Sequence, residues 1–381
     1  MLTLKKVFGY LFLLFLLISF IYLGHQYAIA KAPSGIVYNK ETELDSMKYG
    51  QVVSIDQVNA NPDNPDLKEI YFTAILFLDH DRGETVKAKQ IINGSKSDQM
   101  ELSIDDKVAL LSYGNEYVFQ YYFRLDKIIM LGCAFIGLVL LFGKLKGLQT
   151  ILALGLTCFS IFYVFIPFIC AGFNIYLSTL IICIYIIIAT FGIVYGMNKK
   201  STVAAISCLL GVLLSNVVVV FVDKSMKLTG YLNENSYILS DLLGIQNLDV
   251  KAILYAMITI GAMGAIMDVS MSITSSLNEL KSKNHNITCI ELIQSGFRIG
   301  KDILGTMMNT LILAYIGSSL TVVLVYASSH YPLLSLLNKE EIIFEFLQSL
   351  IGSICLLFTM PISTLIYAFV FLHRKKVMYR I

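Results

Sequence analysis

One carboxylate stands well inside an apolar run of this sequence, and it is the side chain best placed to do chemistry. Asp268 lies in the run 252–271. At helical spacing it shares one face with Ser272 and with small residues one and two turns earlier. An ionisable side chain inside a bilayer is costly and commonly marks an ion or substrate pathway. The alternative is a structural role, in which Asp268 pairs with a lysine or caps a helix near the cytoplasmic surface.

A second polar face opens the next apolar run, 303–326. Asp302, Thr306 and Asn309 follow one another at helical spacing. We expect this face to meet the Asp268 face and to form a polar site open to the cytoplasm. In the alternative, the same side chains are hydrogen-bonded contacts that hold two helices together without a transport role. The residues expected to let the helices pack closely are Gly261, Gly264 and Gly305.

Catalytic, metal and cofactor sites have little support in the sequence. Asp268 and Asp302 on neighbouring helices would form a carboxylate pair, but neither stands in a Tyr-Asp or Gly-x-Gly-Asp context. The seven cysteines contain no CxxC pair, and the five histidines are scattered through loops and flanks. We therefore expect a protein that is not an enzyme, with no catalytic residue, no metal site and no cofactor.

The composition shows what kind of protein must position these residues. Hydrophobic residues make up 56% of the 381 residues and charged residues only 15%, whereas about 25% are charged in an average soluble domain. The mean hydropathy of +0.70 excludes an ordinary soluble enzyme. It also excludes a disordered chain, which needs low hydrophobicity and high charge. A net charge of +2 does not indicate a nucleic-acid-binding protein, which commonly carries a large excess of basic residues.

Eight apolar runs indicate membrane helices, since about 20 helical residues cross a hydrocarbon core of about 30 Å. The fold class predicted from them is mainly α: a polytopic helical membrane protein with about eight transmembrane helices embedded in a lipid bilayer. The runs are 7–23, 128–142, 148–166, 175–195, 203–222, 252–271, 303–326 and 346–372.

Basic residues indicate the orientation of these helices, because Lys and Arg concentrate in cytoplasmic loops. With the N-terminus inside, fourteen basic residues fall in cytoplasmic segments and four in the two sizeable outer loops. Eight crossings also return the C-terminus to the inside, so we expect both termini in the cytoplasm. The fourteen are Lys5, Lys6, Lys144, Lys146, Lys199, Lys200, Lys281, Lys283, Arg298, Lys301, Arg374, Lys375, Lys376 and Arg380, and the four are Lys224, Lys227, Lys251 and Lys339.

The first run, within residues 1–24, allows two interpretations. Lys5 and Lys6 precede it and small residues follow it, as in a secretory signal peptide. However, its apolar core is long for a signal peptide, and Tyr22 and His25 at its end are bulky. We favour an uncleaved N-terminal transmembrane anchor.

Residues 25–127 differ in composition from the rest of the chain, and the part from 32 to 124 carries fifteen of the 27 acidic residues. Stretches rich in β-forming residues recur there, and Asp81–Glu84 is typical of a hairpin turn. We expect a small extracytoplasmic β-rich domain inserted after the first helix. The aromatic residues at 121–123 are expected to extend the next helix as an interfacial collar. The strand-like stretches are 48–56, 68–78, 84–92 and 107–112.

The remaining residues, 128–381, are expected to form a seven-helix transmembrane domain. Its connection 277–300 is amphipathic, with apolar residues such as Ile290 and Phe297 interspersed with Lys281 and Arg298. This pattern favours a cytoplasmic helix that lies on the inner leaflet. The alternative is a lid over the polar site.

The stretch 261–276, followed by the glycine-rich opening of the seventh run in 295–315, resembles the YibE/F family of bacterial membrane proteins. The resemblance covers most of the chain, including the domain after the first run, the Lys199-Lys200 turn and the Gly317 end of the seventh run. It implies a multi-pass protein of the bacterial plasma membrane. It also implies a hetero-oligomer with a shorter YibE/F-type membrane protein, because members commonly occur as neighbouring pairs. It implies no catalytic residue.

The leading functional hypothesis is a transporter, permease or exporter subunit whose path passes the polar residues. The sequence has no Walker A motif, so an ion gradient or a partner ATPase would supply the energy. The alternative is a non-transporting scaffold or receptor whose extracytoplasmic β domain binds a partner. Runs three to five and six to eight show no inverted repeat, which weakens the transport hypothesis. The sequence does not specify a substrate. The expected path residues are Asp268, Ser272, Asp302, Thr306 and Asn309.

Overall fold

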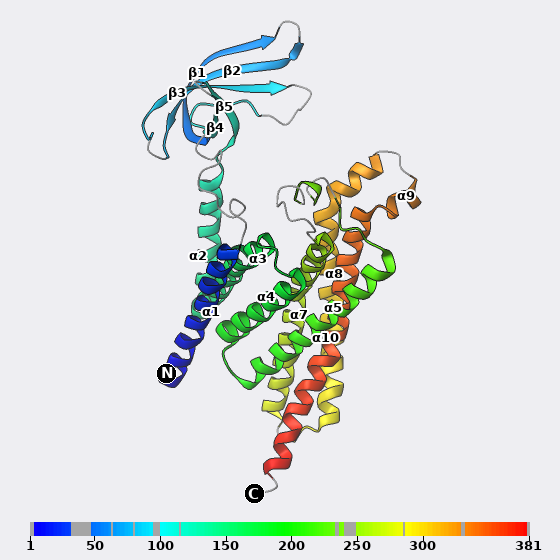
Figure 1. Cartoon of the computed structure of the whole chain (residues 1–381). Coiled ribbons are helices and arrows are strands. Elements are labelled where there is room, and N and C mark those ends of the chain that lie inside the picture. Colours follow the sequence, from blue (N-terminus) through cyan, green and yellow to red (C-terminus); the bar gives the residue numbers. More distant parts are fainter. Residues whose placement is uncertain are drawn as a thin grey trace. The chain divides into compact units, whose positions relative to one another are not determined.

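The chain folds into two compact units (Figure 1): one contains all five strands and the first part of helix α2 (Leu125–Ser160), and the other is helical. One unit comprises Tyr38–Phe142, and the other joins Met1–Val37 to Gly143–Ile381. The computed structural model describes residues 4–31, 47–61, 64–78, 81–93, 100–113, 116–232, 236–239, 249–284, 286–328 and 332–378.

Five strands of the first unit close into a barrel with the order β1-β2-β3-β5-β4. Neighbouring strands are antiparallel except β3 and β5, which run parallel and pair only at Ala88–Tyr117 and Lys89–Val118. A five-stranded barrel with this meander and crossover has the topology of an OB fold. The strands are β1 (Met47–Asn61), β2 (Asn64–Leu76), β3 (Thr85–Asn93), β4 (Lys107–Tyr113) and β5 (Glu116–Tyr122).

Alternating side chains along the strands build the barrel core. Along β2, Phe72, Ala74 and Leu76 point inward and are buried, whereas Tyr71 and Ile75 between them are exposed. The prediction of a small β region is therefore confirmed. The other core residues are Val52, Val86, Ala88, Leu102, Val108 and Leu110.

The predicted turn before β3 is also present. The Gly83 backbone amide donates to the Leu76 carbonyl over 2.8 Å, and Gly83 has φ +92°, a conformation that suits glycine. The aromatic collar was wrong for Tyr121 and Tyr122, because both lie in β5 rather than at the start of a helix. The residues of β5 are exposed or half-buried without a clear alternation, and such a stretch gives only a weak strand signal.

Seven helical segments among the described residues are long and apolar enough to cross a membrane. The chain is therefore a multi-pass membrane protein. Its helices are α1 (Leu4–Lys31), α2 (Leu125–Ser160), the π-helix η2 (Ile161–Phe165), α3 (Ile166–Cys170), α4 (Ile175–Thr190), the π-helix η3 (Phe191–Tyr195), α5 (Lys199–Met226), α7 (Val250–Lys283), α8 (Cys289–Ser328), α9 (Leu333–Leu337) and α10 (Glu340–Met378).

The difference between seven segments and eight predicted runs lies in α2. The helical stretch Leu125–Cys170 counts as one segment of 46 residues, and it contains both predicted runs 128–142 and 148–166. Lys144, in the middle, leaves helical geometry with φ 50° and ψ −127°, so two helices meet there across a kink. At 1.5 Å per residue the stretch would span about 70 Å, more than twice a hydrocarbon core. The predicted boundary therefore coincides with a real break in the helix.

The core of the helical unit is the group α5, α7 and α10, on which α4 and α8 also pack (Figure 1). A Cβ on Gly211 of α5 would lie 2.7 Å from Thr359 Oγ1 of α10 and 2.8 Å from Ile266 Cγ2 of α7. Glycine is thus needed where the three helices converge. By contrast, α8 buries only one narrow face, and most of its surface faces outward.

The predicted connection 277–300 is divided between two helices. α7 continues to Lys283 and α8 begins at Cys289, so only five residues separate them. The amphipathic pattern belongs to the adjoining ends of two long helices. At 1.5 Å per residue, the 34 residues of α7 extend about 50 Å, well beyond a hydrocarbon core.

The predicted N-terminal anchor is part of the folded helical unit. α1 places Leu13 and Leu17 in the core, and Leu13 fills the space beside Gly192 of η3. The Tyr185 hydroxyl donates to the Leu17 carbonyl over 3.3 Å. These contacts make α1 part of the packed helical unit.

Candidate functional site

The predicted polar face of α7 points away from the helix core. Asp268, Gly261 and Gly264 are exposed, while Ile266 and Val269 on the other side are buried. Ser272 is half-buried. Asp268 has no hydrogen-bonding or ionic partner within the described part of the chain, and it lies within electrostatic range of Tyr195 and Cys208. The single chain therefore leaves this carboxylate uncompensated.

The predicted polar face of α8 is exposed as well. Asp302, Thr306 and Asn309 all lie on the outward side of the helix, and the Thr306 hydroxyl donates locally to the Ile303 carbonyl over 2.9 Å. The buried face of α8 is the opposite one and packs against α10. It consists of Leu292, Gly296, Gly300 and Leu304.

The structure brings α7 and α8 together at other positions than Asp302–Asn309. A Cβ on Gly261 would lie 2.7 Å from the Tyr315 hydroxyl of α8, so Gly261 is a close-packing position. No atom lies within 4 Å of a Cβ at Gly264 or Gly305. Neither glycine is therefore a close-packing position among the described residues. Among the described residues no hydrogen bond joins Asp268 to Asp302 or Asn309.

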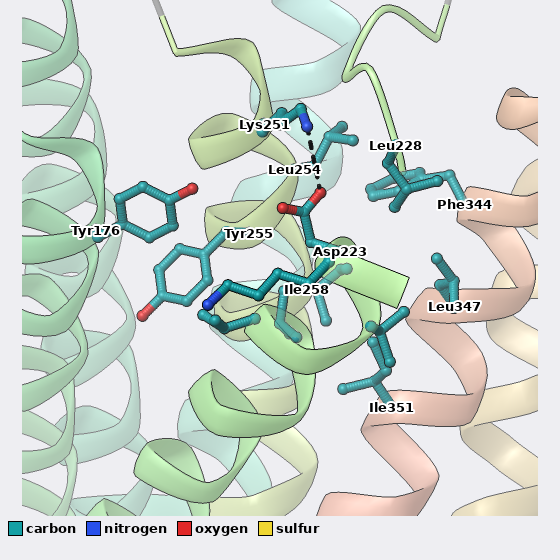
Figure 2. A pocket seen from close by; sticks show the side chains of 14 residues that line it. Tyr176, Asp223, Leu228, Lys251, Leu254, Tyr255, Ile258, Phe344, Leu347 and Ile351 are labelled. Carbon is teal, nitrogen blue, oxygen red and sulfur yellow. Dashed lines mark ion pairs between the residues drawn. The ribbon is translucent and has the colours of Figure 1, made fainter. Parts of the chain in front are cut away.

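A cavity of about 220 Å³ between α4, α5, α7 and α10 was not expected from the sequence (Figure 2). Asp223, at the end of α5, and Lys251, at the start of α7, lie across it with 3.8 Å between the Lys251 Nζ and the Asp223 Oδ1. Tyr176 and Tyr255 form one wall, with ring centroids 4.7 Å apart. The rest of the lining is apolar and includes Val219, Leu254, Ile258, Phe344, Leu347 and Ile351. An apolar pocket with a few polar groups is the usual form of a small-molecule site.

A carboxylate of α10 fixes the turn that closes one side of this cavity. Glu340 accepts hydrogen bonds of 2.7 Å from the Thr229 amide, the Thr229 hydroxyl and the Gly230 amide. Gly230 has φ +92°, and a Cβ there would lie 2.9 Å from the Lys251 amide nitrogen, so the turn must pass close to α7. The adjacent Leu228 is buried and lines the cavity. Glu340 therefore fixes the segment that closes one side.

Buried polar side chains also lie on three of the helices that line the cavity, α5, α7 and α10. The Thr259 hydroxyl of α7 donates to Asn216 Oδ1 of α5 over 3.2 Å. Further along α7 and α10, several buried side-chain oxygens have no hydrogen-bond partner among the described residues, which is uncommon for buried polar groups. They include the hydroxyls of Ser270, Ser353, Ser363 and Thr364. We call Asn216, Thr259 and these four residues the hydroxyl seam.

The sequence pattern of YibE/F-like proteins matches residues 131–373 of the chain, which is more than half of it. The chain belongs to the YibE/F-like family. No curated protein and no solved structure matches it. The family assignment made from the glycine-rich segments of α7 and α8 is therefore confirmed.

The YibE/F-like match begins within α2 and ends within α10, so it contains the cavity, the hydroxyl seam and both polar faces. Strands β1 to β5 lie outside the matched range, so the match does not extend to the domain after the first run that the sequence resemblance includes. Among the described residues of this YibE/F-like chain, no group of three or more His, Cys, Asp or Glu side chains is arranged to hold a metal ion.

The cavity could have been found from one signal. Asp223 and Lys224 stand near the end of one apolar run and Lys251 before the next, so charges of both signs flank a pair of neighbouring helices. In the predicted topology, Lys224 and Lys251 count only as charges of an outer loop. The approach of α4 and α10, which complete the walls, has no local signal in the sequence.

Proposed function

We propose that this YibE/F-like protein is a permease or exporter subunit of the bacterial plasma membrane, with both termini in the cytoplasm. The cavity between α4, α5, α7 and α10 carries the proposal together with the hydroxyl seam, whose unpaired hydroxyls lie on α7 and α10. The charge distribution favours an outer position for the cavity end, next to Asp223 and Lys251. Solutes would enter or leave at that end and pass along the seam.

The unpaired hydroxyls are what distinguishes this seam from ordinary helix packing. A polar group without a partner is expensive where no water is available, so stable helix interfaces normally satisfy such groups. Ser270, Ser353, Ser363 and Thr364 would find partners in a transported polar solute, or in water admitted with it. Repacking of the helices around small residues such as Gly211 would open the path.

The exposed polar faces of α7 and α8 support a second subunit. A carboxylate facing hydrocarbon costs about 2.5–3.5 kcal/mol even on the lenient insertion scale. Asp268, Asp302 and Asn309 would avoid this cost by facing polar groups of another membrane chain, and Gly264 and Gly305 leave room for close approach. A shorter YibE/F-type protein is the proposed partner. Because the sequence has no Walker A motif, an ion gradient or a partner ATPase would supply the energy.

A comparison of solute distribution tests the transport proposal. Cells lacking the gene are complemented with the wild type, with Ser270→Leu or Ser353→Leu, or with Ser318→Leu as the control on the exposed side of α8. Small molecules of cells and medium are then profiled without a preselected substrate. We expect the wild type and the control to restore the distribution, and the two seam variants to fail at equal membrane abundance. Full restoration by the seam variants would contradict the proposal.

A non-transporting receptor or scaffold is the second candidate function. It is favoured by the barrel, which is a compact unit with its own buried core. In that case the hydroxyl seam and the two polar faces serve helix packing alone. Deletion of the gene would then leave solute distribution unchanged, whereas removal of the barrel would abolish the cellular phenotype.

A further inference from the structure

A surface hollow of about 350 Å³ lies where β1, β2, β3 and β5 of the barrel meet. Its volume is within the range of about 300–1,000 Å³ that is usual for small-molecule sites. It adjoins the short parallel seam between β3 and β5, where only two residue pairs join the strands. The side chains that matter for recognition are Asp56, Gln57, Tyr71, Lys87, Lys89 and Tyr117.

Strand register fixes the position of the central aromatic ring. Tyr71 of β2 pairs with Gln57 of β1 and with Lys89 of β3, so the three side chains form a row across the sheet. Its neighbour Phe72 fills the barrel core, which forces Tyr71 to the outside. Tyr117, paired beside the buried Ala88, lines the hollow at the β3–β5 seam with a half-buried ring that packs against the barrel core.

Hydrogen bonds hold the polar groups around these rings. Asp56 accepts from the Thr73 hydroxyl over 2.6 Å and from the Ser54 hydroxyl over 2.7 Å, and these bonds lower the pKa of the Asp56 carboxyl. The Lys89 ammonium donates to Glu116 over 2.8 Å, which raises the pKa of Lys89. Both groups are therefore charged and in place at neutral pH.

The acidic and basic side chains around the hollow balance, which favours an uncharged ligand. Asp56 and Glu116 oppose Lys87 and Lys89. The whole segment 47–122 holds twelve acidic and seven basic residues, so its net charge of −5 disfavours nucleic acid and other polyanions. Flat tyrosine rings with carboxylate, amide and ammonium groups around them suit a ligand that has apolar ring faces and many uncharged hydroxyls.

We propose that the hollow binds a neutral oligosaccharide, with a sugar ring packed on Tyr71 and its hydroxyls bonded to Asp56, Gln57 and Lys87. The barrel topology agrees, because OB folds use the face of strands 2 and 3 for oligosaccharides as well as oligonucleotides. That agreement is an analogy of fold, and the residues of the hollow carry the proposal. The proposal is independent of transport through the helical unit.

Titration calorimetry on the purified full-length protein tests the assignment. The probes are a β-1,4-linked N-acetylglucosamine hexamer, which represents wall-type glycan, and maltohexaose and cellohexaose, which represent free glucans. A hexanucleotide is the anionic probe. The variants are Tyr71→Ala, Tyr71→Phe, which keeps the ring, and Tyr121→Ala, the matched control, since Tyr121 is exposed on β5 outside the hollow.

We expect at least one neutral hexasaccharide to bind and Tyr71→Ala to weaken that binding by about ten-fold or more. Tyr71→Phe and Tyr121→Ala should stay close to the wild type. The hexamer that binds best distinguishes a wall-type glycan from a free glucan. The proposal is overturned if none of the three sugars binds, if only the hexanucleotide binds, or if Tyr121→Ala weakens binding as much as Tyr71→Ala does.

Discussion

At the scale of single residues, Asp268 is the main argument for the proposed second subunit. Its carboxylate is exposed on α7, and the described part of the chain offers it no partner. Such a group needs a polar partner, water or a proton when it faces hydrocarbon. The neighbouring Gly264 has open space beside it, so another helix could approach closely at this depth.

The prediction for Asp268 separates function from structure. Since none of the described residues forms a hydrogen bond or an ion pair with Asp268, Asp268→Asn should insert and accumulate as the wild type does, with a stability change within about 0.5 kcal/mol. It should nevertheless abolish the cellular phenotype of the wild-type gene. Membrane abundance and complementation are measured together, with Ser318→Ala, an exposed change on α8, as the control. Full complementation by Asp268→Asn would show that the charge is dispensable.

A residue of the barrel allows a test by pH. Hydrogen bonds from Thr73 and Ser54 lower the pKa of Asp56, so the stabilisation it provides is present above its unfolded-state pKa and is lost as pH falls through the folded-state pKa. Thr73→Val removes the shorter bond and should raise the Asp56 pKa toward the ordinary value of about 3.9. Carbon-13 NMR titration of segment 33–124 measures the pKa. The exposed Thr85→Val is the control and should leave it unchanged.

At the scale of elements, glycines decide which helix faces can meet. Gly296 and Gly300 lie one turn apart on the buried face of α8, and α10 fills the space beside both, through Thr364 and Met360. Gly305 lies on the opposite, open side of the same helix. α8 therefore packs on α10 through the face with Gly296 and Gly300. The face with Gly305 makes no close contact with the described residues.

Substitution of these glycines should reveal the difference. A Cβ on Gly296 would lie 2.5 Å from Thr364 Cγ2 and 3.1 Å from its Cβ, and a β-branched side chain has little freedom to move away. Gly296→Ala should therefore destabilise the protein by about 1–3 kcal/mol. Gly305→Ala, in open space, should be neutral or slightly stabilising because alanine favours helix. Thermal unfolding in detergent compares the two, and equal destabilisation would contradict the assigned packing.

The sequence predicted the elements better than it predicted their contacts. Apolar runs and basic flanks are local signals, so the membrane helices and even the break near Lys144 could be located. The face of α7 that carries Asp268 was also identified, but the helix it meets depends on packing across the whole bundle. Small residues occur on both faces of α8, at Gly296 and Gly305, and the pattern alone could not show which face is buried. The cavity was missed for the same reason, since four separate helices build its walls.

At the scale of the whole molecule, the family match and the unit boundaries separate two kinds of structure. The match of residues 131–373 lies almost entirely in the helical unit, whereas the strands of the barrel lie outside it. This organisation is expected if family members share the helical unit and the barrel is an addition to it. The transport proposal and the saccharide proposal therefore concern different units and can succeed or fail separately.

The orientation of the helical unit depends on how α2 crosses the membrane. One crossing by Leu125–Cys170 gives seven crossings and places the C-terminus opposite the N-terminus. Two crossings, joined at the non-helical Lys144, give eight and place both termini together. The charge count favours eight, because Lys144 and Lys146 then join the other basic residues in the cytoplasm. A stretch of about 70 Å is also too long for one crossing of a core of about 30 Å.

Thiol labelling of intact cells tests this parity. Single cysteines are placed in a cysteine-free background at Lys146, Ser236, Ser282 and Ser95, the last of which lies outside the described residues. With eight crossings, an impermeant reagent should label positions 95 and 236 and leave 146 and 282 unlabelled until the cells are opened. Labelling at 282 in intact cells would contradict the predicted orientation of α7 and α8. Labelling at 146 in intact cells would mean that the kink does not lie on the cytoplasmic side of the membrane. The side of the membrane on which the cavity end lies would then have to be assigned again.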